Sequence, residues 1–158
     1  MMLSVAALAA CVGGPDEQPP SGVGDSFATR ATAVCQTALD DKQAWSAFPA
    51  ADFNPEEPDP APFPEVGAWL EGEVAPTFEA WLNGLTALGQ PPSAQQAWSD
   101  VLAAIDTIVN LNADQVRAAQ SADVEGFIEA TDGLHAVQSE LERATAAAGV
   151  PTCADVHK

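Results

Sequence analysis

Histidine, the side chain that activates many catalytic nucleophiles, is scarce in this 158-residue sequence. A Ser–His–Asp triad or a Cys–His pair needs a histidine beside the nucleophile, and the sequence has two histidines, His135 and His157. His157 stands so near the chain terminus that we expect it to be disordered. Neither a GxSxG motif nor a glycine-rich phosphate loop occurs. We therefore expect a protein that is not an enzyme and that uses no cofactor.

One pair of residues has the spacing of a metal site in a helical bundle. Asp132 and His135 are three residues apart, which places a carboxylate and an imidazole on adjacent turns of a helix. Di-iron bundles use Glu-x-x-His twice, with further glutamates from other helices. Here the motif occurs once, and Glu125 and Glu129 fall off the apolar stripe of the same helix. Asp132 and His135 are thus weak metal candidates, and a solvated helix face is the simpler interpretation.

Spaced oxygen ligands also occur in the segment DFNPEEPD, residues 52–59. Carboxylate and amide oxygens suit calcium, but the segment lacks the glycine and the terminal bidentate glutamate of an EF-hand loop. Its prolines also restrict the wrapping of a loop around an ion. We expect a solvated acidic loop rather than a calcium site.

Acidic residues dominate the charge of the chain. There are 23 Asp and Glu against 5 Lys and Arg, so the formal net charge is -18. Such a surface repels phosphate backbones, which excludes nucleic-acid binding. A cationic partner fits this charge, and so does a simple role of the acidic surface in solubility.

The elements that position these residues are expected to be helices. The chain is rich in alanine, lacks strand-like runs, and repeats apolar residues at steps of three and four. The pattern predicts an all-α fold, an antiparallel up-down four-helix bundle. Its helices are expected at about 26–47, 65–88, 93–120 and 123–148, with a proline-rich loop over 49–64.

Local signals set the limits of these helices. Gly89 and Gly149 are expected to end the second and fourth helices, and Ser93 to cap the third. Pro76 lies inside the second helix, where we expect a kink or a short break. Asn112 could interrupt the third helix, because the residues after it resemble a new helix start.

Aromatic residues gather on both sides of the proline-rich loop. We interpret them as a candidate partner surface, at the end of the bundle far from the N-terminus, although tryptophans are more often core residues. The five members are Trp45, Phe48, Phe53, Phe63 and Trp69.

The N-terminal segment has the character of an export signal. Residues 3–10 are mostly apolar and too few to span a membrane. Leu8-Ala9-Ala10-Cys11 resembles the lipobox of bacterial lipoproteins, although no Lys or Arg precedes the apolar residues. The resemblance implies that residues 1–10 are a signal peptide remnant that is removed. It also implies that Cys11 carries a diacylglyceryl group and anchors the chain in a membrane.

This resemblance also bears on the state of the two remaining cysteines. If Cys11 is lipidated, Cys35 and Cys153 remain, and an oxidising compartment would allow them to form a disulfide. Two buried free thiols are the alternative. The chain also resembles small exported bacterial helical lipoproteins, through Cys35 in the first helix and the Gly149 and Cys153 that close the last. Residues 11–24 are then a lipidated cysteine with a flexible tether, and residues 25–158 the bundle domain.

These observations predict a lipid-anchored protein on the extracytoplasmic side of the bacterial cell envelope, with a non-catalytic binding or scaffolding role. Its expected partners are the membrane, through the lipid on Cys11, and an envelope protein or a cationic partner. One alternative is a carrier of a small apolar ligand, held in a pocket between helices near the Pro76 kink. A metal-binding helical bundle is another.

Overall fold

The structure, a computed structural model, describes the backbone of residues 22–158 and the side chains from Phe27 onward. The expected signal segment, the lipobox, Cys11 and most of the predicted tether lie outside the described residues. The part of the chain that is described is all-helical, as predicted, and contains no strand. Its elements are α1 (Gly22–Gln43), α2 (Phe63–Trp69), the π-helical turn η1 (Leu70–Val74), α3 (Ala75–Ala87), α4 (Gln95–Ser121), α5 (Val124–Ala147) and the 3-10 helix η2 (Pro151–Val156).

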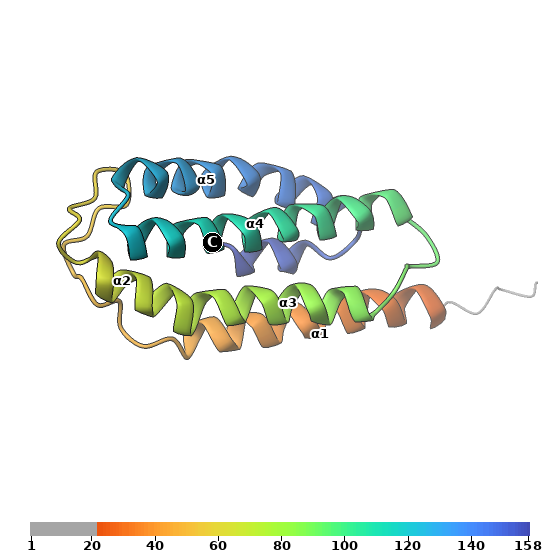
Figure 1. Ribbon diagram of the computed structural model, residues 1–158. Coiled ribbons are helices and arrows are strands. Elements are labelled where there is room, and N and C mark those ends of the chain that lie inside the picture. The colour runs from red at the N-terminus through yellow and green to blue at the C-terminus, as the bar shows by residue number, and fades with distance from the viewer. Residues whose placement is uncertain (1–21) are drawn as a thin grey trace, which may run out of the picture.

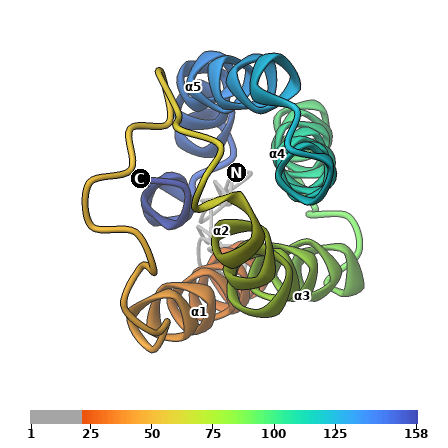
Figure 2. The ribbon, with the colours of Figure 1, turned by 60° about the vertical axis from the view of Figure 1, so that its left-hand side comes forward.

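Long helices enclose one core. Figure 1 shows α2, η1 and α3 in line as one rod beside α1, with α4 and α5 above them. Helix α4 packs against α5, α3 and α2, whereas η2 packs against α1 and α5 (Figure 2). The largest side chains that are fully buried come from α2, α3, α4 and α5: Trp81, Trp98, Phe63, Leu85, Ile105, Ile108 and Leu141.

Helix α1 begins and ends four residues earlier than the sequence pattern predicts. It starts at Gly22, so the last three residues of the expected tether are helical, and it ends at Gln43 rather than near residue 47. Trp45 therefore lies in the loop that follows. Its indole N–H donates to Thr77 Oγ1 at 2.9 Å, which draws the chain away from the helix axis and onto α3.

Pro76 is accommodated by a change of helix type. A proline inside an α-helix removes one amide donor, and its ring crowds the carbonyl four residues earlier. Here the rod widens over Leu70–Val74, where the Ala75 N–H bonds to Leu70 O, five residues back. Pro76 then stands in the first turn of α3, where an amide donor is not required. The predicted disturbance at Pro76 is thus a π-helical turn.

The two glycine signals are confirmed, and two other signals are wrong. Gly89 and Gly149 have φ of 73° and 77°, the left-handed conformation of a helix end. Ser93 does not cap α4; Ala94 occupies the capping position with φ 58° and makes no side-chain bond. Asn112 does not interrupt α4, because its side-chain amide donates to Ile108 O at 2.9 Å within the same buried helix face.

A disulfide joins Cys35 of α1 to Cys153 of η2. Their sulfurs are 1.99 Å apart and their Cα atoms 5.1 Å apart, and both residues are fully buried. The segment after α5 folds back as the 3-10 helix η2, which brings Cys153 to α1. The Trp81 indole N–H lies 3.3 Å from Cys35 Sγ, so the bond is packed inside the core.

Loss of this disulfide should destabilise the fold. The bond closes a loop of 118 residues, and its removal should lower the free energy of unfolding by about 2–5 kcal/mol. Urea unfolding of the Cys35→Ser/Cys153→Ser variant, or of wild type with reductant, measures this loss. The Cys11→Ser variant is the control and should unfold at the wild-type midpoint. An unchanged midpoint in the double variant would contradict the prediction.

Candidate functional site: an aromatic cavity beside the π-helical turn

A cavity of about 180 Å³ opens where α1, the π-helical turn, α4, α5 and η2 meet. Three aromatic rings and three aliphatic side chains supply its apolar wall, and three polar side chains complete it. The apolar members are Trp45, Trp69, Phe78, Leu70, Val74 and Leu134, and the polar members are Lys42, Asn112 and His157. We call this set the aromatic cavity.

The wide turn η1 shapes one wall of the cavity. Leu70 and Val74 are its first and last residues, and both side chains are buried. Trp69 precedes the turn and Phe78 follows it by one helical turn, so one short segment contributes four lining residues. π-Helical turns of this kind occur frequently at functional sites. Val74 and Phe78 each lie two residues from Pro76 in the sequence, but Pro76 itself does not line the cavity.

The tryptophan rings of the cavity pack edge to face. The Trp45 and Trp69 ring centroids are 5.5 Å apart with their planes at 84°, and Trp45 lies 6.2 Å from Phe78. Hydrogen bonds fix both indoles, because Trp45 donates to Thr77 and the Trp69 indole N–H donates to Ser46 O at 3.2 Å. These rings therefore form a preformed wall rather than a mobile one.

The five aromatic residues predicted as a partner surface do not share one environment. Phe63 is fully buried and stacks 5.2 Å from Phe127, so it is a core residue and cannot belong to a surface. Phe53 is half-buried between Phe63 and Phe127. Phe48 alone of the five is exposed, at 38%, and its ring packs 5.1 Å from Trp69.

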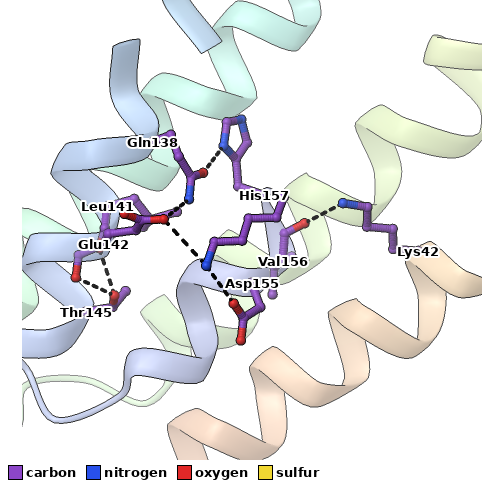
Figure 3. Close-up of polar contacts among 9 residues, drawn as sticks. Lys42, Gln138, Leu141, Glu142, Thr145, Asp155, Val156 and His157 are labelled. Carbon is purple, nitrogen blue, oxygen red and sulfur yellow. Dashed lines mark hydrogen bonds and ion pairs between the residues drawn. The ribbon is translucent and has the colours of Figure 1, made fainter. Parts of the chain in front are cut away.

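The polar side chains of the cavity come from α1, from α4 and from His157, the residue that follows η2. The Lys42 ammonium donates to Val156 O at 3.2 Å and lies 5.8 Å from the centre of the Trp45 ring. Lys42 also stands in the last turn of α1, where a cation complements the helix dipole. Figure 3 shows Lys42 reaching Val156 of η2 from one side, while Gln138 of α5 reaches the next residue, His157, from the other.

His157 is ordered by a chain of hydrogen bonds, contrary to our expectation of disorder. The Gln138 side-chain N–H donates to Glu142 at 2.9 Å, which turns the Gln138 amide oxygen toward His157 Nδ1 at 2.6 Å (Figure 3). Because that oxygen only accepts, we assign the imidazole proton to Nδ1. Nε2 is then left as the acceptor of a neutral ring.

Burial sets the charge state of this histidine. The pKa of His157 falls to about 4, mainly because burial removes the ring from water. Lys42 and His135 lower it further, because they disfavour a positive charge on this ring. Burial also lowers the pKa of Lys42. At neutral pH the cavity is thus lined by one ammonium and one uncharged imidazole.

The predicted metal candidates are not brought together with other ligands. Asp132 and His135 are both exposed on α5. Within residues 27–158, no group of three or more His, Cys, Asp or Glu side chains could hold a metal ion. In the proline-rich loop, Asn54 and Asp59 accept hydrogen bonds from the backbone N–H groups of Glu56 and Ala61, so their side chains shape turns.

Sequence reasoning missed the polar members of the cavity. Lys42 and Trp45 are three residues apart in the sequence, but the predicted helix over 26–47 runs past Trp45, whereas α1 ends at Gln43. Asn112 was interpreted as a helix start, and His157 as part of a disordered end.

No helix of residues 22–158 combines the length and the apolarity that crossing a bilayer requires.

The buried histidine should make stability depend on pH. His157 has a folded-state pKa of about 4, below its unfolded value of about 6.5. Its contribution is therefore complete above pH 6.5 and is lost as the pH falls toward 4. With a discount for the partial exposure of the ring, wild type should lose about 1 kcal/mol between pH 7 and 5 relative to His157→Gln.

Urea unfolding of both proteins at each pH measures the difference. The matched control is Ala136→Gln, which introduces the same side chain at an exposed position of α5 and should lose stability as wild type does. Parallel losses in wild type and His157→Gln would show that the ring is not held neutral.

Comparison of the chain with protein-family models, curated proteins and solved structures found no match. What the aromatic cavity can bind is therefore derived from its own residues: an aromatic wall that suits a flat apolar group, beside a single ammonium.

Proposed function

We propose that this chain is a lipid-anchored protein of the bacterial cell envelope that acts by binding a partner, without catalysis. The lipobox-like segment Leu8-Ala9-Ala10-Cys11 supports the anchor. The Cys35–Cys153 disulfide fits an exported protein, because disulfides persist in oxidising compartments. Neither a metal nor a cofactor has a role in this proposal.

The exposed ring of Phe48 carries the binding proposal. Phe48 is the one large hydrophobic side chain that is exposed among residues 27–158. It rests on Trp69 and on Phe53, whose ring centre is 5.6 Å away. Half-buried aromatic residues around an exposed one are typical of the centre of an interface. We name Trp45, Phe48, Phe53 and Trp69 the aromatic patch.

Acidic side chains flank the aromatic patch and favour a cationic partner. The exposed carboxylates of the neighbouring loop belong to Asp52, Glu56, Glu57 and Asp59. A positively charged surface would be attracted to this loop while an aromatic or aliphatic side chain packed on Phe48. The partner class we propose is therefore a cationic envelope protein.

The arrangement of the helices would place the aromatic patch at the end of the molecule that faces away from the membrane. We infer that α1, the α2–η1–α3 rod, α4 and α5 form the expected up-down four-helix bundle. The loop with Phe48 lies at the end of the molecule opposite Gly22, where the described chain begins (Figure 1). A chain anchored through Cys11 would then turn its aromatic patch away from the bilayer.

A second candidate function is a carrier of a small apolar ligand, and the aromatic cavity is the observation that favours it. Its volume of about 180 Å³ exceeds that of the 150 Å³ apolar cavity known to bind benzene in a protein interior. One ring-sized molecule would therefore fit among Trp45, Trp69 and Phe78.

The anchor should be detectable by mass spectrometry of bacterial membrane fractions. The N-terminal peptide should begin at Cys11, carry a diacylglyceryl thioether and lack residues 1–10. The Cys11→Ala variant should lose both the lipid and the membrane association, while the control Cys153→Ala keeps both. Recovery of wild type with residues 1–10 attached and Cys11 unmodified would refute the anchor.

The partner surface should be detectable by photo-crosslinking in living cells. A benzophenone amino acid in place of Phe48 should give a defined adduct with a cationic envelope protein, because the two aromatic side chains are similar in shape. The matched control carries the same amino acid in place of Ala136, which is exposed on α5, and should give no such adduct. Equal labelling at the two positions, or none at position 48, would overturn the proposed surface.

A further inference from the structure

The aromatic cavity differs in charge from the rest of the molecule. The chain carries 23 acidic and 5 basic residues, yet the lining of this cavity contains one lysine and no carboxylate. Four other hollows on the described part of the chain each include at least one carboxylate, for example Asp114, Glu125, Asp41 and Glu142. An anionic ligand would thus be repelled by nearby carboxylates in those four hollows. In the aromatic cavity it would instead meet the positive charge of Lys42.

Lys42, unlike three other basic residues of the described chain, forms no ion pair. Arg117, Arg143 and Lys158 pair with carboxylates, and all three are exposed. Lys42 is half-buried and has no carboxylate partner among residues 27–158. Its contacts are Val156 O and the face of Trp45, and an ammonium has three protons to donate.

A half-buried ammonium that has no carboxylate partner favours the binding of an anionic ligand. Burial lowers the pKa of Lys42 because the charged form loses hydration. A carboxylate at Nζ would replace that hydration with a charge-assisted hydrogen bond, which is about twice as strong as a neutral one. The neutral ring of His157 adds no positive charge of its own, so Lys42 is the single cation of the site.

We propose that the aromatic cavity binds a small aromatic carboxylate, with its ring among Trp45, Trp69 and Phe78 and its carboxylate on the Lys42 ammonium. This assignment rests on the second candidate function, the carrier of a small apolar ligand, and it names the class of ligand. The volume of about 180 Å³ limits the ligand to about one ring with a short acidic substituent.

Calorimetric titration with three single-ring probes tests the assignment at matched ionic strength. The probes are benzoate, the neutral benzyl alcohol and the cationic benzylamine. Benzoate should bind wild type at least about tenfold more tightly than either of the others, as expected for one charge-assisted hydrogen bond. The Lys42→Met variant should lose about tenfold in benzoate affinity and keep its affinity for benzyl alcohol.

Two further variants distinguish the loss of the Lys42 charge from a general disturbance of the fold. Lys158→Met removes a lysine that is near η2 but does not line the cavity, and it should bind benzoate as wild type does. Lys42→Arg retains the positive charge and should retain benzoate binding even if Lys42→Met is poorly folded.

The outcomes distinguish this assignment from the functions on which it depends. Benzyl alcohol or benzylamine binding as tightly as benzoate, or equal benzoate binding by wild type and Lys42→Met, would overturn the carboxylate assignment and leave the carrier function standing. Absence of binding by all three probes would overturn both. Neither result bears on the partner surface at Phe48, which is tested separately by crosslinking.

Discussion

The covalent bond between Cys35 and Cys153 is the constraint on which the rest of the molecule depends. It holds η2 against α1, and Lys42 and Gln138 then fasten the same short helix from opposite sides. A six-residue 3-10 helix has little stability of its own, so its position has to come from such ties. With η2 in place, His157 closes one side of the aromatic cavity.

The same contacts account for the unusual electrostatics of the cavity. A carboxylate beside Lys42 would have satisfied its charge, but the lysine instead meets a backbone carbonyl and an indole face. His157 is kept uncharged by burial and by its neighbours. The described part of this strongly acidic protein thus contains a small region where an anion is not repelled at close range. At physiological ionic strength, salt largely screens carboxylates that lie more than about 8 Å from the site.

The extent of prediction from sequence differed between helices, loop and site. Apolar periodicity and the glycines at positions 89 and 149 located the helices to within a few residues. The end of α1 was misplaced because the Trp45 indole bonds to Thr77 on a distant helix, and local pattern does not contain that contact. Phe63 was assigned to the surface because its neighbours are prolines, yet it packs on Phe127, 64 residues away in sequence. The site could not be predicted, because its polar residues come from three separate elements.

The wide turn at Leu70–Val74 has a consequence for how this rod can change. A π-helical turn holds one residue more than the α-helical turn it replaces. Deleting one residue, such as Gly72, would restore regular winding and leave Val66 and Phe78 facing the same neighbours. The ring of Pro76 would then collide with a carbonyl of the tightened turn. The extra residue and the proline are therefore expected to be gained or lost together in any viable homologue, and a chain that lost only one of them should be recognisable by a bent rod.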